Sequence, residues 1–308
     1  MSKWIPERPL YRKERLLVGY PLLAVFVLLF LARLFGNLIG DAAQSLWLKF
    51  LAVLGVFLLP TVVFLLLRGP GYGRVLRLRL PRAGQTPLLI SAFFALLSGC
   101  LLFSILCGGI ESLGNSTTSY EISPAADPLH GIILTVVLAI LPALFEEFFF
   151  RGIVVAEYER RGAIRAVLLS ALLFALCHFD LRNLPVYLFS GILFALVLFA
   201  TDSLLATIIL HICYNMVSLF GQRYLNALYS ITGSIELFLF LLILILMLSL
   251  LLFFRTGARL YRQRHESGQR DPRRDVPRNV QFYTILDALA DPPVILCILV
   301  SILGFILL

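Results

Sequence analysis

Nine long apolar runs follow one another along this chain, and they constrain its fold more than any other feature. Each is a continuous stretch rich in Leu, Ile, Val, Phe and Ala, without the alternation of a barrel strand. A helix needs about 20 such residues to cross a membrane. We therefore predict an all-α fold, a polytopic transmembrane helix bundle with eight spans and a short ninth span at the C-terminus. The nine runs are 16–36, 48–67, 87–110, 131–156, 166–179, 184–200, 204–220, 235–254 and 294–308.

The composition excludes most other classes of protein. Only 14% of the 308 residues are charged and 60% are hydrophobic, whereas soluble domains carry about 25% charged residues. A soluble enzyme, a disordered chain and a disulfide scaffold are therefore excluded. The five cysteines all lie in apolar runs and lack the spacing of a zinc site, so we interpret them as small buried residues.

The same patterns predict how the chain is divided. Residues 1–254 form a transmembrane helical domain, with a functional core at about 130–220. Residues 255–291 are polar and basic, and they are predicted to form a cytoplasmic linker with a segment lying along the membrane interface. Residues 292–308 then form a last membrane segment.

The net charge of +8 reflects membrane topology. Most of the 26 Lys and Arg residues lie in four polar segments that the predicted spans place on one side, at 1–15, 68–82, 157–165 and 255–278. The positive-inside rule makes that side cytoplasmic, together with the N-terminus. The partner of these charges is the lipid bilayer, and no nucleic acid is expected. Arg far outnumbers Lys, which favours an integral protein of a bacterial cell membrane.

A few polar residues lie within the apolar spans, where ionisable groups are costly and usually functional. Counted from the cytoplasmic ends of three separate spans, Glu146, His178, His211 and Asn215 lie about 14 to 20 Å deep. A shared depth on separate helices predicts one cluster near the middle of the membrane. The candidate site residues are Glu146, Glu147, Arg151, His178, His211 and Asn215.

Local spacing separates these residues by role. Glu147 and Arg151 are four positions apart, which favours an ion pair on one face of a helix. Glu146 points about 100° away from that face and is left without a partner on its own helix, so it is the candidate general base. His211 and Asn215 are also four positions apart and reach the same space.

Three short motifs carry a resemblance to a known family. Residues 146–151 fit E-E-x-x-x-R, residues 174–178 fit F-x-x-x-H, and residues 211–215 fit H-x-x-x-N. In this order and on separate membrane helices, the motifs resemble the CPBP family of CAAX proteases and bacteriocin-processing enzymes. The resemblance covers about 130–220.

This resemblance implies an intramembrane endopeptidase that hydrolyses peptide bonds of membrane-embedded or lipidated peptides and proteins. It implies that Glu146 activates water with the help of His178. His211 and Asn215 would form the oxyanion hole. Water attack needs such a base and such donors on general grounds as well.

The resemblance also implies that Glu147 and Arg151 support the site. We expect no cofactor and no metal. The alternative is a zinc ion held by Glu146, His178 and His211, a two-histidine, one-carboxylate ligand set. The alternative functions are a catalytically silent membrane scaffold or immunity protein and a proton-coupled transporter.

Overall fold

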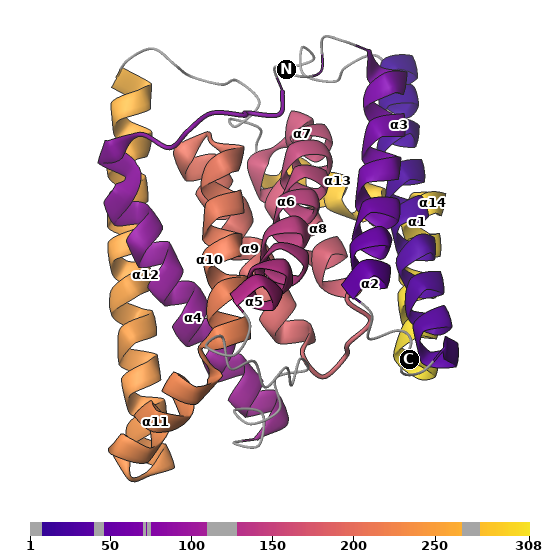
Figure 1. Ribbon diagram of the computed structural model, residues 1–308. Coiled ribbons are helices and arrows are strands. Elements are labelled where there is room, and N and C mark those ends of the chain that lie inside the picture. The colour runs from indigo at the N-terminus through magenta and orange to yellow at the C-terminus, as the bar shows by residue number, and fades with distance from the viewer. Residues whose placement is uncertain (1–7, 40–45, 70–71, 73–74, 110–127, 267–277) are drawn as a thin grey trace.

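The computed structural model describes residues 8–39, 46–69, 72, 75–109, 128–266 and 278–308 (Figure 1). Helices dominate this part of the chain and no strand occurs in it, which confirms the predicted all-α class. The α-helices are α1 (Arg8–Ile39), α2 (Leu46–Val53), α3 (Leu59–Arg68), α4 (Thr86–Gly108), α5 (Pro128–Thr135), α6 (Leu141–Glu147), α7 (Val155–Tyr158), α8 (Ala163–Leu176), α9 (Leu184–Thr201), α10 (Leu204–Phe220), α11 (Gln222–Thr232), α12 (Ile235–Glu266), α13 (Arg278–Leu289) and α14 (Pro292–Leu307). The π-helical segments are η2 (Leu54–Leu58), η6 (Val136–Ile140) and η7 (Phe148–Val154), and the 3-10 turns are η4 (Ala83–Gln85) and η8 (Glu159–Arg161).

The described helices make the protein an integral membrane protein. Six of them are long and apolar enough to cross a membrane, and the number rises to eight if each of two bent pairs is one span. One bent pair joins α10 to α11 at 72°, and the other joins α13 to α14 at 66°. Each predicted run contains a described helix, but nine span-length helices are not found in the described part.

Helix α8 accounts for this difference. It has 14 residues, fewer than the about 17 that a crossing requires. Its predicted span continued to residue 179, but the chain leaves the helix at Leu176 and Phe179 takes a left-handed conformation with φ 49°. His178 therefore lies in the turn between α8 and α9 and not inside a span, which corrects the prediction.

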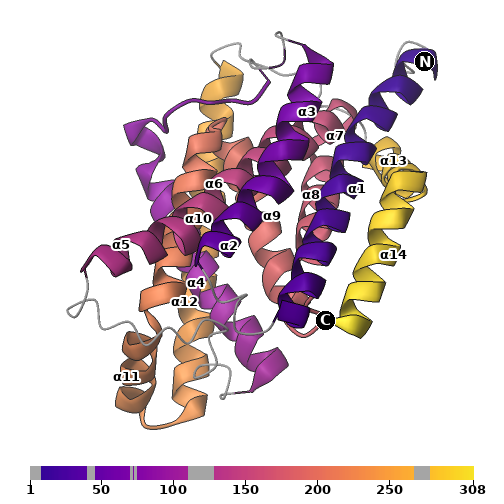
Figure 2. The ribbon, with the colours of Figure 1, turned by 45° about the vertical axis from the view of Figure 1, so that its right-hand side comes forward.

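The helices pack in three groups (Figures 1 and 2). Helix α4 packs along α12 and α9 on one side, whereas α1 packs against α3 and α14 on the other. Helices α6, α8, α9 and α10 lie between these groups and pack on one another. All candidate site residues come from this central group and the segments that continue it.

Helices α8 and α9 approach each other closely because Gly191 has no side chain. A Cβ at this position would lie 3.0 Å from Cα of Ala171, closer than packed side chains allow. This contact brings the backbone of α9 to the centre of the bundle.

The two ends of the described chain lie at opposite ends of the bundle. Helix α1 begins at the top of Figure 1 and α14 runs beside it to the bottom (Figures 1 and 2). Helix α12 continues to Glu266, through the first part of the stretch predicted as a linker. Residues 267–277 of that stretch, and the first seven residues of the basic N-terminal segment, lie outside the described residues.

Candidate active site

The helix that carries both candidate acids is irregular on both sides of α6. A π-helical segment, η6, precedes α6, and a second, η7, follows it directly. Pro142 lies in the first turn of α6 and lacks the N–H that a regular helix would use there. Such π-helical segments are rare and occur frequently at functional sites. They set the direction in which Glu146 and Glu147 point.

Glu147 is completely buried and joins two helices. Its Oε1 accepts hydrogen bonds from Nη1 of Arg151 at 2.9 Å and from Nδ1 of His211 at 3.0 Å. Its Oε2 has no hydrogen-bond partner. The predicted pair with Arg151 is therefore present, and the bond to His211 is an additional one.

Arg151 is buried where η7 packs against α8 and α9. Its guanidinium carbon lies 4.5 Å from the ring centroid of Phe174 and 5.2 Å from that of Phe194. Nη2 donates to the carbonyl of Gly191 at 2.9 Å. A carboxylate, a carbonyl and two ring faces thus compensate the buried positive charge.

Glu146 has different surroundings from its neighbour. Its side chain is half-buried, and no hydrogen bond or ion pair to another described residue occupies its carboxylate. The charged groups that act on it electrostatically include His211, Glu147, Arg151 and Arg33. One acid of the pair is therefore hydrogen-bonded to two side chains, and the other is free to bind water or substrate.

His178 is held in one orientation by three contacts. Its Nδ1 donates to the carbonyl of Phe174 at 2.7 Å, since a carbonyl can only accept. The imidazole stacks on the Tyr187 ring at a centroid distance of 3.9 Å and meets the edge of Phe174 at 4.8 Å. This tautomer leaves Nε2 with a lone pair that can take a proton.

His211 and Asn215 lie on the side of α10 that faces η6 and α6. The His211 ring stacks on Phe194 at 4.6 Å, while its Nδ1 is bonded to Glu147. Asn215 donates through Nδ2 to the carbonyl of Ala139 in η6, at 3.3 Å. An amide has two N–H groups, so one donor of Asn215 remains for a ligand.

The structure brings the six predicted residues into one region without joining all of them. Phe174 connects the two histidines, because its ring contacts both His178 and His211. No hydrogen bond between described residues joins Glu146 to either histidine.

Among the described residues, no three His, Cys, Asp or Glu side chains are grouped to hold a metal. The residues of the zinc alternative do not fit a metal centre in this arrangement.

Some residues that shape the site could not be recognised from the sequence. Tyr187, Gly191 and Phe194 all lie on α9 and are ordinary members of an apolar run. Only contacts with side chains far away in the sequence give them a role. Asp180 accepts two hydrogen bonds from Asn183, at 3.0 and 2.8 Å, and so stabilises the turn that begins α9.

Comparison with known families finds a similarity over the part of the chain that carries these residues. Residues 128–217 match a family model described as Rce1-like, type II CAAX prenyl endopeptidase Rce1-like. This segment is similar to the CAAX endopeptidase family. The match confirms the family predicted from the motifs, and all six candidate residues lie inside it. Neither the curated proteins nor the solved structures include a match to the chain.

The CAAX endopeptidase match supports peptidase activity in a membrane-embedded chain. Such an enzyme acts on substrates that are associated with the bilayer. The matched residues begin at α5 and end in α10, so α1 to α4 and α11 to α14 lie outside the match.

Proposed function

We propose that this protein is an intramembrane endopeptidase in which Glu146 activates the attacking water. The free carboxylate accepts a proton from water as the oxygen attacks the carbonyl carbon of the peptide. His178, with its Nε2 lone pair, assists by orienting the water or sharing the proton. The proton then passes to the leaving nitrogen as the C–N bond breaks, and Glu146 returns to its starting state.

His211 and Asn215 stabilise the tetrahedral oxyanion in this proposal. The second N–H of Asn215 supplies one donor. His211 supplies another when both ring nitrogens are protonated, because Nδ1 is bonded to Glu147 and Nε2–H then points away from it. The bond from Nδ1 to the Glu147 carboxylate fixes the orientation of the ring, much as a buried aspartate orients the histidine of a serine protease. Glu147 and Arg151 are therefore positioning residues.

The contrast between the two neighbouring acids carries this proposal. Glu147 is buried, and its Oε1 is bonded to both Arg151 and His211, which makes it unsuitable for exchanging protons with substrate. Glu146 is half-buried and unbonded among the described residues. Two adjacent carboxylates with opposed surroundings are typical of a division between catalytic and supporting roles.

The decisive experiment replaces Glu146 by Gln in the purified, reconstituted protein. We expect kcat to fall by a factor of about 10² to 10⁴ because the general base is lost, while folding and membrane insertion are retained. The matched control is Glu236→Gln, an exposed acid in the first turn of α12, which should leave activity unchanged. Unchanged cleavage by Glu146→Gln would contradict the proposal.

A peptide panel and a chelator complete the experiment. The panel contrasts prenylated C-terminal peptides with the same peptides lacking the lipid, and with transmembrane peptides. The family match favours cleavage of the lipidated substrates. We expect activity to survive the chelator, and loss of activity that zinc restores would establish the metal alternative instead.

A further inference from the structure

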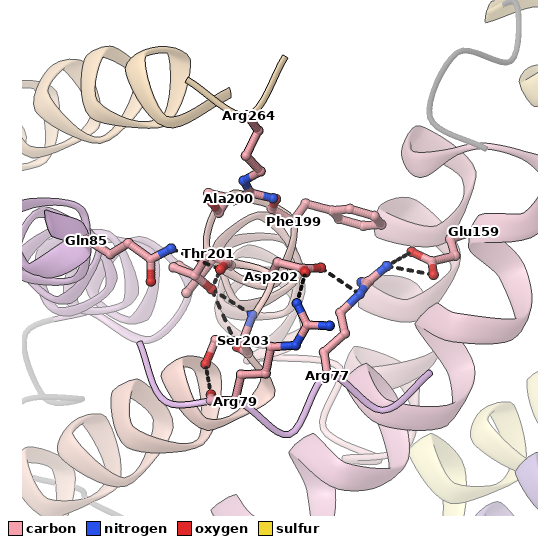
Figure 3. A network of polar contacts seen from close by, with 11 residues as sticks. Arg77, Arg79, Gln85, Glu159, Phe199, Ala200, Thr201, Asp202, Ser203 and Arg264 are labelled. Carbon is pink, nitrogen blue, oxygen red and sulfur yellow. Dashed lines mark hydrogen bonds and ion pairs between the residues drawn. The ribbon is translucent and has the colours of Figure 1, made fainter. Parts of the chain in front are cut away.

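Arg77 lies between α3 and α4 and contacts two elements of the central group at once (Figure 3). Its Nη2 donates to both carboxylate oxygens of Glu159, at 2.7 and 2.6 Å, and its Nε lies 3.0 Å from Oδ1 of Asp202. Its carbonyl accepts a hydrogen bond from N of Leu204 at 2.9 Å. The side chain and the backbone of one residue therefore join η8 to the turn that begins α10.

The surroundings hold Arg77 in one conformation. Its side chain is only 11% exposed and that of Glu159 only 4%, so solvent and salt screen this ion pair weakly. The guanidinium carbon lies 5.6 Å from the ring centroid of Phe199. The backbone is left-handed, with φ 52°, which is uncommon for a residue with a side chain and persists where the surrounding contacts fix it. Arg77 is therefore a fixed junction between segments of the chain.

Neighbouring contacts fix the same segment to the start of α10. Nη1 of Arg79 lies 3.1 Å from Oδ2 of Asp202, and the carbonyl of Arg79 accepts a hydrogen bond from the Ser203 hydroxyl. The same hydroxyl caps α10, because it accepts a hydrogen bond from N of Ala206 at 3.1 Å. The segment 77–79 thus determines where α10 begins.

The two elements that Arg77 joins carry opposite halves of the proposed site. Glu159 lies near the end of a helical run that continues without a break from η6 to η8 and includes both candidate acids. Asp202 and Leu204 begin the helix that carries His211, which lies about 14 Å further along the axis. Helix α10 packs against η6, α6 and η7 of that run. A change at the Arg77 junction therefore moves the two halves of the site relative to each other.

Hydrogen bonds within the site also join these helices. Nδ1 of His211 is bonded to Glu147, and Nδ2 of Asn215 is bonded to the carbonyl of Ala139. In the proposed mechanism, both of these α10 residues also act on the substrate. Arg77 takes no part in the reaction, so its contacts can stay the same while a substrate binds and is cleaved.

We infer that Arg77 is a positioning residue, which fixes α10 along the helix of the two acids and so places the donors of α10 relative to Glu146. Arg77 lies outside the residues 128–217 that match the family model, so the match does not assign it this role. The inference rests on the proposed peptidase function for the reaction that is affected. A displacement of about 1 Å in such a site can lower the rate about 100-fold.

The variant Arg77→Lys separates the bridge from the charge. Lys keeps the positive charge that contributes to membrane topology, but it lacks the planar fork with which a guanidinium contacts two carboxylates in fixed directions. We expect kcat to fall by about 10- to 100-fold. KM should change little, because the displaced donors act in the transition state. An unchanged kcat in Arg77→Lys, or a change in KM alone, would overturn the inference.

The matched control is Arg68→Lys. Arg68 forms an ion pair with Glu157 on the same helical run, with side-chain exposures of 13% and 2%, which are close to those of the Arg77–Glu159 pair. Its contacts in the described part of the chain are with Glu157 and with the rings of Phe64 and Tyr72, away from α10. Arg68→Lys should therefore lose a similar amount of stability and keep its kcat. An equal fall in kcat in both variants would overturn the inference.

A double variant separates positioning from partial unfolding. Arg77→Lys should lower kcat by a smaller factor in an Asn215→Ala background, because a donor that Arg77 places is already absent. Partial unfolding would lower kcat by the same factor in both backgrounds. Equal factors would therefore count against a positioning role.

A distance measurement tests the placement without any activity. Nitroxide labels on Ile133→Cys in α5 and Ile209→Cys in α10 report the separation of the two halves of the site, and both positions are exposed. Ser replaces Cys107 and Cys213, the two exposed native cysteines. Pulsed electron paramagnetic resonance then measures the distance between the labels in reconstituted protein.

The distance should shift or broaden by at least about 1 Å in Arg77→Lys and stay the same in Arg68→Lys. An unchanged distance in Arg77→Lys would overturn the inference. Absence of cleavage by the wild-type protein would count against the peptidase function, and the label distance would still decide whether Arg77 positions α10.

Discussion

Replacing Glu147 by Gln should destabilise the protein strongly, although the two side chains have nearly the same shape. The ion pair between Glu147 and Arg151 is fully buried, with 0% exposure of each of the two side chains. The substitution leaves the guanidinium charge buried without its counter-charge. Removing one partner of such a pair costs about 3 to 5 kcal/mol.

The surroundings of Arg151 reduce that cost. Gln retains a carbonyl oxygen that can accept from Arg151, the bond to the Gly191 carbonyl remains, and the rings of Phe174 and Phe194 still face the charge. We therefore expect a loss of about 2 to 4 kcal/mol in the free energy of unfolding, toward the lower part of the range for a broken buried pair.

A double-mutant cycle makes this reasoning testable. Arg151→Met combined with Glu147→Gln removes both charges, so the double variant should be more stable than the sum of the single losses implies, by at least about 1.5 kcal/mol. Equilibrium unfolding in mixed detergent micelles measures all four proteins, with Glu236→Gln as an exposed control. The reasoning is refuted if Glu147→Gln lies within about 0.5 kcal/mol of the wild type or if the two losses simply add.

Three further predictions concern other parts of the molecule. The hydroxyl of Tyr72 donates to buried Glu157 at 2.9 Å, so Tyr72→Phe should cost about 1 kcal/mol. Burial and the Glu157 charge raise the pKa of Tyr72. The stabilisation that its hydroxyl provides is therefore present below about pH 10 and is lost as the pH rises above that value. The free energy of unfolding measured against pH would show this loss. Gly304→Ala makes a Cβ collide with the ring of Phe179 and should cost roughly 1 to 3 kcal/mol. The control Gly257→Ala meets nothing closer than 3.7 Å and should gain about 0.5 kcal/mol in the same unfolding assay. Asn215→Ala should lower kcat by about 10² to 10³ with little change in KM, and an effect on KM alone would argue against an oxyanion role.

The sequence supports the helical class and the polar cluster because both depend on local or averaged properties. Apolar runs of span length have few alternatives to a membrane helix, and the pair Glu147–Arg151 follows from helical spacing alone. The depth expected for His211 follows from counting residues along its span, whereas His178, counted in the same way, lies in the turn after α8 and not inside a span. Each of these inferences needs no knowledge of which helices touch.

Other features depend on contacts that no local pattern encodes. The bond between Glu147 and His211 joins residues 64 positions apart, and it requires that α10 packs along α6 in one particular register. The end of α8 before His178 depends on a turn stabilised by Asp180 and Asn183, which hydropathy does not detect. The apolar run therefore overestimated the length of that helix.

The two π-helical segments around α6 make the site depend on the length of the chain as well as on its chemistry. A π turn closes its hydrogen-bonded ring over one residue more than an α turn. If η7 closed as a regular α-helix with the same number of residues, the extra residue would rotate α6 by about 100° relative to α7. Glu146 would then face another part of the bundle with every motif residue still in place. The extra residue that the π turn takes up is therefore as necessary for the direction of Glu146 as the motif residues are for its chemistry.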